Sequence, residues 1–283
     1  MDARSIAATT ANGGLLTAAT EVDYDPTVPE YQYDRSSYDA RVYQGFGKGS
    51  YDTLLKLGPN IKDWPEIAPL GENLLLKVAS FITDPVTTTD ELIPSGETSS
   101  YRSNPLGLAE FTLSRKDPAY VGRAKAVQSE EAARRAGQGD ASLLDKIHAV
   151  PGCEALTWAD VQLASTIYAV KPGDGSAREQ AASCQRVLGA GANIVSEYAT
   201  KRYRSNLINW GMLPLQLSGP APFGLGDYIL IPNVRQALEG DLQNIPAYVL
   251  GEKVLPFTLY MAPLTADERR ILADGCLINY YKH

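Results

Sequence analysis

Short apolar runs alternate with polar, helix-compatible segments over most of the chain. Residues 166–170 form one such run, whose β-branched and aromatic side chains are typical of a buried strand. The run ends at Pro172, Gly173 and Gly175, and the glycines permit backbone angles that a side chain would forbid. A helical pattern begins at Ser176. The stretch therefore predicts a strand, a glycine-containing turn and a helix.

The first turn of this predicted helix has two interpretations. Its backbone N–H groups have no partner within the helix and lie at the positive end of the dipole, which favours a bound carboxylate or phosphate. Arg178 could add a forked donor to a carboxylate. Alternatively, Ser176 and Glu179 have the spacing of a capping box, which serves only the helix's own amides. Capped turns are common in α/β folds, and the spacing alone leaves both interpretations open.

The chain after this turn continues with alternating elements. The helix should run to about Leu188 and be followed by a strand at 193–195, which predicts a βαβ-like unit. A second helix is expected over about 201–210. Three short apolar runs near the C-terminus, 226–231, 247–250 and 257–261, predict a small sheet or barrel lip. A capped helix over 265–275, with glycine at its end, closes the chain.

The chain before the turn divides into three parts. An alanine-rich helix is expected over 2–14, ended by Asn-Gly-Gly, and the tyrosine-rich segment up to residue 60 is typical of a linker. Residues 74–82 predict a strand, and 88–96 a polar loop after it. Residues 105–148 have helical, peripheral patterns.

Composition narrows the functional classes. The 283 residues carry 26 basic and 33 acidic side chains without a long basic stripe, which argues against nucleic acid as a partner. No apolar run approaches the roughly 20 residues that a membrane span requires, and no secretory signal is visible. The three cysteines are far apart and form no disulfide or metal framework. We therefore expect a cytoplasmic protein with reduced thiols and no membrane partner.

Five sequence blocks in order carry a resemblance to a known family. The chain resembles the C-terminal, swivelling domain of the aconitase family, in which the corresponding turn reads Gly-Ser-Ser-Arg-Glu and holds substrate carboxylates. The blocks are Gly-Ser-Ala-Arg-Glu-Gln-Ala-Ala from Gly175, Arg-Val-Leu-Gly from Arg186, Ala-Asn-Ile-Val from Ala192, Ser-Asn-Leu from Ser205 and Gly-Met-Leu-Pro-Leu from Gly211. The resemblance implies an α/β fold, a swivelling β/β/α domain, with an N-terminal extension from the preceding domain.

The resemblance also implies a domain division. It becomes continuous from Ile61, so residues 1–60 are expected to be the end of a preceding catalytic domain plus a linker, and residues 61–283 the aconitase-like swivel domain. The chain would then be the C-terminal portion of a longer protein. Its expected partners are the cluster-bearing N-terminal domains of that protein and a small polycarboxylate.

Further site residues follow from the resemblance. A Thr-Thr-Asp loop leads into the active-site cleft in the family and corresponds here to the loop with Thr89 and Asp90. An arginine that contacts a substrate carboxylate corresponds to Arg102, which residue frequency alone would interpret as an ordinary surface side chain. Together with Gly175, Ser176 and Arg178, these residues form the expected substrate-binding set. Two guanidinium groups would suit a di- or tricarboxylate because they bind carboxylates bidentately and keep their charge.

One position departs from the family pattern. The resembling enzymes move water across a carbon–carbon double bond of a hydroxy-polycarboxylate with a 4Fe–4S cluster as Lewis acid, and the base is the second serine of Gly-Ser-Ser-Arg. Here that position is Ala177, which has no oxygen to accept a proton. No catalytic residue or metal ligand is therefore assigned, and the cluster is expected in the full-length protein, outside this chain. Three hypotheses remain: a hydro-lyase with another base, a non-enzymatic carboxylate-binding or interaction module, and a small subunit of a two-chain dehydratase.

Overall fold

The structure is a computed structural model that describes residues 1–25, 27–41, 45, 47–54 and 56–282. The chain divides into two compact units, Met1–Leu55 and Lys56–His283. Each unit is described by itself. Among the described residues, no helix is both long and apolar enough to cross a membrane.

The first unit contains the predicted N-terminal helix. This helix, α1 (Ala3–Ala11), begins after Asp2, whose carboxylate accepts hydrogen bonds from the first-turn amides, and it ends before Gly13 and Gly14. The predicted linker, residues 21–60, includes residues 26, 42–44, 46 and 55, which lie outside the described residues. Its described part contains one short helix, α2 (Ser36–Arg41).

The second unit is built on a mixed seven-stranded sheet, which confirms the predicted α/β class. The strand order is β6-β5-β3-β1-β7-β8-β9. The first four strands of this order are parallel, and the last three are antiparallel to their neighbours. The strands are β1 (Asn73–Ile82), β3 (Val161–Ala169), β5 (Ala190–Val195), β6 (Leu213–Gln216), β7 (Tyr228–Ile231), β8 (Ile245–Leu250) and β9 (Val254–Leu259).

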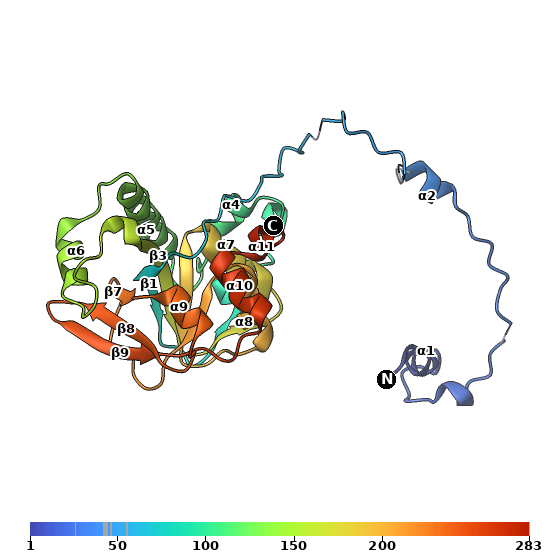
Figure 1. Cartoon of the computed structure of the whole chain (residues 1–283). Helices are drawn as coiled ribbons and strands as arrows, with labels where there is room; N and C mark the ends of the chain where they lie inside the picture. The colour runs from blue at the N-terminus through green and yellow to red at the C-terminus, as the bar shows by residue number, and fades with distance from the viewer. Residues whose placement is uncertain (26, 42–44, 46, 55, 283) are drawn as a thin grey trace. The chain divides into compact units, whose positions relative to one another are not determined.

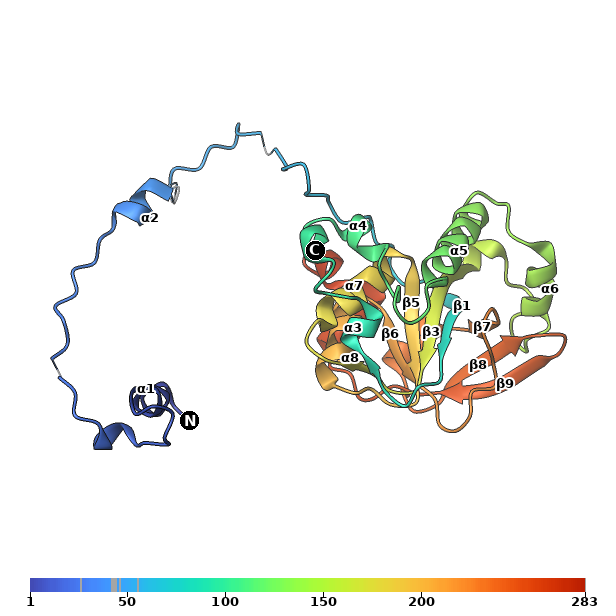
Figure 2. The same cartoon turned by 180° about the vertical axis from the view of Figure 1, so that it is seen from behind.

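Helices cover both faces of the sheet. Helices α5 and α7 pack on one face, where their buried side chains join Ile167 and Ala169 of β3 in one cluster, and α9 and α10 pack on the other face against Leu74 and Leu76 of β1 (Figures 1 and 2). Alternate side chains of β1 explain this arrangement, because Leu74 and Leu76 join one buried cluster while Leu75 joins another. The helices are α3 (Thr89–Leu92), α4 (Pro105–Ala109), α5 (Tyr120–Arg135), α6 (Ala141–His148), α7 (Arg178–Val187), α8 (Lys201–Asn209), α9 (Val234–Glu239), α10 (Ala266–Asp274) and α11 (Leu277–Tyr280).

Several predicted elements are confirmed. Strand β3, helix α7 and strand β5 form the predicted βαβ unit, with β3 and β5 parallel. Helix α10 has the predicted cap, since Thr265 and Glu268 form a capping box and Gly275 adopts a φ of 92° after the last turn. The predicted helical region 105–148 contains α4, α5 and α6.

Two local predictions were wrong. Residues 88–96 are not only loop, because Thr88 and Glu91 form a capping box that starts α3, and Leu92 and Ile93 are fully buried. The C-terminal strands do not form a separate small sheet or barrel lip. Strand β7 pairs with β1, so these strands extend the main sheet.

Candidate anion-binding site

The turn before α7 is held in place from two sides. Strand β4 (Pro172–Asp174) pairs with β2 (Thr87–Thr88) in a small parallel sheet, which brings the threonine segment beside the turn. Gly173 has a φ of 95°, and a Cβ there would lie 2.4 Å from the ring of Tyr203. Gly175 has a φ of 137°, and its Cβ would lie 2.1 Å from Oγ1 of Thr89. Both positions therefore require glycine.

The capping box predicted for Ser176 and Glu179 is not formed. Helix α7 begins at Arg178 rather than at Ser176, and its N-cap, Ala177, makes no side-chain capping hydrogen bond. Glu179 instead accepts a hydrogen bond at Oε1 from Nε1 of Trp210, at 3.0 Å. The first turn of α7 consequently has no side-chain cap, and Ser176 does not cap its backbone amides.

A pocket of about 290 Å³ lies at this helix start. We call it the loop pocket. It brings together Arg102 and Ser176, two residues predicted from distant parts of the sequence, and it also contains Ala177. The residues that line it are Ser95, Arg102, Ser176, Ala177, Glu179 and Gln180. Arg102 follows a short 3₁₀ turn and is exposed.

The other predicted site residues lie around the loop pocket without lining it. Gly175 packs against the buried Thr89 behind the turn. Arg178 is half-buried in the first turn of α7, and its Nε is buried without a hydrogen-bond partner among the described residues. Asp90 is about half-exposed and pairs with Arg115, whose Nη2 also binds Glu97 at 2.6 Å.

The buried Tyr203 hydroxyl and Cys184 thiol near the turn are uncharged at neutral pH. Burial raises the pKa of Tyr203, whose hydroxyl accepts hydrogen bonds from Gln185 and Asn193 at 3.0 and 2.8 Å. Burial and the nearby Glu179 carboxylate raise the pKa of the Cys184 thiol to about 12. The charges that face the loop pocket near neutral pH therefore come from Arg102 and Glu179.

Three lining residues were not predicted as site residues. Ser95 lies in the segment that was expected to lead into the cleft, and Gln180 directly follows the predicted turn. Glu179 was assigned to the capping box, and its place in the pocket depends on Trp210, 31 residues further along the chain. The position of Gln180, two residues after Arg178, was the only signal in the sequence that could have included it.

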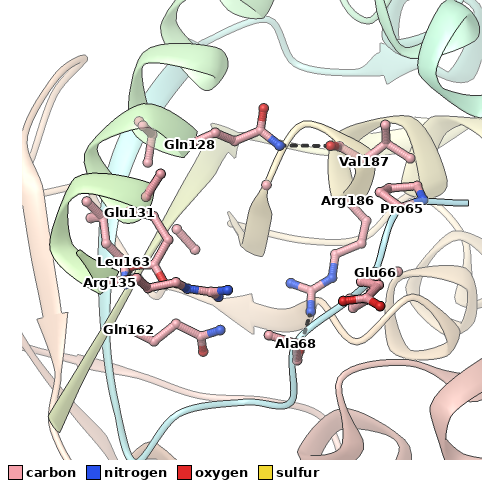
Figure 3. A pocket seen from close by; sticks show the side chains of 15 residues that line it. Pro65, Glu66, Ala68, Gln128, Glu131, Arg135, Gln162, Leu163, Arg186 and Val187 are labelled. Carbon is pink, nitrogen blue, oxygen red and sulfur yellow. Dashed lines mark hydrogen bonds and ion pairs between the residues drawn. The ribbon is translucent and has the colours of Figure 1, made fainter. Parts of the chain in front are cut away.

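A second pocket, of about 260 Å³, lies at the opposite edge of the sheet, where β3 begins and α7 ends. In Figure 3 the guanidinium groups of Arg135 and Arg186 approach it from opposite sides. Arg186 donates to the carbonyl oxygens of Ala190, Ala68 and Gly275 at 2.9, 3.3 and 3.2 Å. Burial lowers its pKa to about 10, so it stays charged near neutral pH. Its bonds join three segments of backbone.

The described residues do not fit a metal cluster. They contain no group of three His, Cys, Asp or Glu side chains placed to hold a metal ion. Cys153, Cys184 and Cys276 are free and buried. No chemical step is therefore derived through an iron–sulfur cluster on this chain.

Comparison with known proteins agrees with the sequence resemblance. The fold and the glycine turn define a mixed α/β unit with a pocket at a helix start. The family model of the aconitase C-terminal domain matches residues 154–220, which include the turn, α7 and β5. The predicted resemblance to the aconitase family is thus confirmed over this range.

A solved structure is also similar to the chain. It is the 3-isopropylmalate dehydratase (leuD) of Methanocaldococcus jannaschii, at 21% sequence identity and a TM-score of 0.43, over 74% of this chain and 93% of that chain. No curated protein matches the chain.

Proposed function

We propose that this chain is the carboxylate-binding portion of an aconitase-like hydratase and that it binds a hydroxy-di- or tricarboxylate in the loop pocket. The observation that carries the proposal is the meeting of Arg102 with the uncapped start of α7 in one pocket. A guanidinium group can grip one carboxylate with two parallel hydrogen bonds. Free first-turn amides favour a second carboxylate at the positive end of the helix dipole.

Arg178 and Ser176 have supporting roles in this proposal. Arg178 belongs to the same helical turn, and its buried Nε, which has no partner in the part of the chain that the structure describes, is a donor that a ligand-induced rotation of the side chain would satisfy. The Ser176 hydroxyl lines the pocket and takes no part in a helix cap, so it is available to a ligand oxygen. Thr89 does not line the pocket but supports the turn through its contact with Gly175. Asp90 could contact a ligand only after its ion pair with Arg115 has broken.

Ala177 favours a second candidate function, a catalytically impaired homologue that binds carboxylates or a partner. Its methyl group lines the loop pocket at the position where the resemblance places the family's base. A methyl group cannot remove a proton, although positioning and electrostatic stabilisation can persist without the base. We propose that the 4Fe–4S cluster and the rest of the active site lie outside this chain.

Calorimetric titration of the full chain with citrate, malate and tartrate tests the binding proposal. We expect at least one of these to bind, and Arg102→Gln to weaken that binding about 10- to 100-fold, the range for losing a hydrogen-bonded charge of about 1.5–3 kcal/mol. Arg235→Gln is the matched control, because Arg235 lies on α9 and does not line the pocket. Absence of binding to all three acids, or equal loss in both variants, would contradict the proposal.

Activity of the full-length protein separates the two candidate functions. If Ala177 is the cause of impairment, the wild-type protein turns over citrate or isopropylmalate slowly and Ala177→Ser increases the rate. Rapid turnover by the wild-type protein would show that another group serves as the base.

A further inference from the structure

Residues 61–71 form an extended segment, here called the strap, that is fixed to the second unit along its length. Near its start, the Lys62 N–H donates to the Ser103 carbonyl at 2.9 Å. In its middle, the Asn279 side chain donates to the Ile67 carbonyl at 2.8 Å. Near its end, the Leu70 N–H donates to the Ala273 carbonyl at 3.1 Å. The strap is therefore an ordered part of this unit.

The strap contacts the surroundings of α7 at both helix ends. At the start, the Trp64 ring packs on the Trp210 ring with centroids 4.4 Å apart and planes inclined by 43°. Trp210 in turn donates its indole N–H to Glu179. At the end of α7, the Ala68 carbonyl accepts a hydrogen bond from Arg186 (Figure 3). The position of α7 is thus tied to the position of the strap.

The contact at the helix start involves Glu179, a charged residue that lines the loop pocket. Glu179 and Arg102 line the same pocket, and a free carboxylate there would compete with a ligand carboxylate for the guanidinium group. The Trp210 N–H donates to Oε1 of Glu179 at 3.0 Å, and hydrogen bonds to charged groups are stronger than those between neutral groups. This bond directs the carboxylate toward Trp210. The same strap also binds Ser103, the neighbour of Arg102, so it contacts residues next to two lining residues of the pocket, Arg102 and Glu179.

We propose that the strap regulates the loop pocket: Trp64 positions Trp210, Trp210 holds Glu179 away from Arg102, and the polycarboxylate affinity depends on this arrangement. The inference rests on the proposed function, since it concerns the affinity of the same pocket. Trp64, Trp210 and Glu179 are positioning residues here.

A double-mutant cycle on the full chain tests this inference, with citrate titration as the readout. Trp210→Phe keeps an aromatic ring for Trp64 but removes the N–H, and we expect citrate affinity to fall about 10-fold, near the lower limit for losing a hydrogen bond to a charged group. In the Glu179→Gln background, the carboxylate that competes for Arg102 is absent. Trp210→Phe should then change the affinity by less than twofold.

The strap contact is tested by Trp64→Ala with Trp64→Phe as its matched control. We expect Trp64→Ala to lower citrate affinity about 3- to 5-fold and Trp64→Phe to retain it, since phenylalanine keeps an aromatic partner for Trp210. The hydrogen-exchange rate of the Trp210 indole N–H supplies a second readout, because it reports the hydrogen bond to Glu179; it should rise in Trp64→Ala but not in Trp64→Phe. If Trp64 does not position Trp210, this exchange rate stays unchanged in Trp64→Ala.

The outcomes separate the regulation from the binding. If wild-type protein binds citrate and Trp210→Phe binds it equally well, the regulation is overturned while the proposed function stands. An equal loss from Trp210→Phe in the wild-type and Glu179→Gln backgrounds also overturns it, because the effect would not pass through the Glu179 charge. If the wild-type protein binds no polycarboxylate, both proposals are overturned.

Discussion

A Cβ on Gly175 would stand 2.1 Å from Oγ1 of Thr89, so the turn before α7 and the start of α3 are in direct contact. Gly175 also has a φ of 137°, which an L side chain rarely adopts. The contact places the glycine turn and the threonine segment together at the candidate site. It exists only because position 175 has no side chain.

Replacing Gly175 by alanine should therefore destabilise the second unit by about 2–4 kcal/mol, from backbone strain and overpacking together. Urea unfolding monitored by circular dichroism measures the effect. Gly219→Ala is the matched control, because Gly219 has a φ of 81° and nothing within 4 Å of its Cβ position. Equal losses in the two variants would show that the contact with Thr89 contributes nothing.

Arg186 should be a major stabilising residue at the opposite end of α7. Arg186→Met removes hydrogen bonds to three backbone carbonyls while keeping an apolar chain, and we expect the free energy of unfolding to fall by about 2–4 kcal/mol. The same replacement at Arg235, which is 40% exposed, should change it by less than about 0.5 kcal/mol. A loss below about 1 kcal/mol at Arg186 would contradict the role of its three bonds.

Glu131 should make stability depend on pH in the acid range. Burial acts to raise its pKa, but hydrogen bonds from Arg134, Arg135 and the Leu163 amide outweigh burial, so the pKa is lowered from 4.5. A lowered pKa means that the stabilisation is complete above the unfolded-state value and is lost as the pH falls through the folded-state value. Stability of wild type and Glu131→Gln should differ by about 2 kcal/mol at pH 7 and converge as the pH falls through the lowered folded-state pKa. A difference that is independent of pH would contradict the assignment.

The cysteines should be unreactive in the folded protein. Cys153, Cys184 and Cys276 are all buried, and the pKa of Cys184 is raised to about 12, so almost no thiolate exists at pH 8. A thiol-specific chromogenic reagent should label none of them within minutes in buffer and all three in 6 M urea. Rapid native labelling of Cys184 would contradict its burial beneath the turn.

Local sequence patterns predicted the elements well but not their long-range contacts. The strand, turn and helix around Gly175 follow from apolar runs, glycines and caps, which act over a few residues. The pairing of β7 with β1 joins residues such as Leu74 and Ile231, and no local pattern specifies that partner. The three C-terminal strands were therefore predicted as a separate sheet, although each was placed nearly correctly.

The same contrast between local patterns and long-range contacts holds for the candidate site. Ser176, Arg178 and the glycine turn were found from spacing, whereas Arg102 required a family resemblance because an isolated arginine carries no signal. The capping box failed because Trp210 competes for the Glu179 carboxylate. That competition depends on the fold, since it joins the first turn of α7 to the C-terminal end of α8.

Chemical-shift mapping of the full chain with citrate tests the central claim most directly. The account predicts that the backbone amides of residues 176–180 and the Arg102 side-chain N–H shift together in a saturable way, and that Arg102→Gln abolishes the saturation. Shifts confined to the second pocket, around Gln128 and Gly189, or no saturable shift at citrate concentrations up to about 10 mM, would contradict a polycarboxylate site at the start of α7.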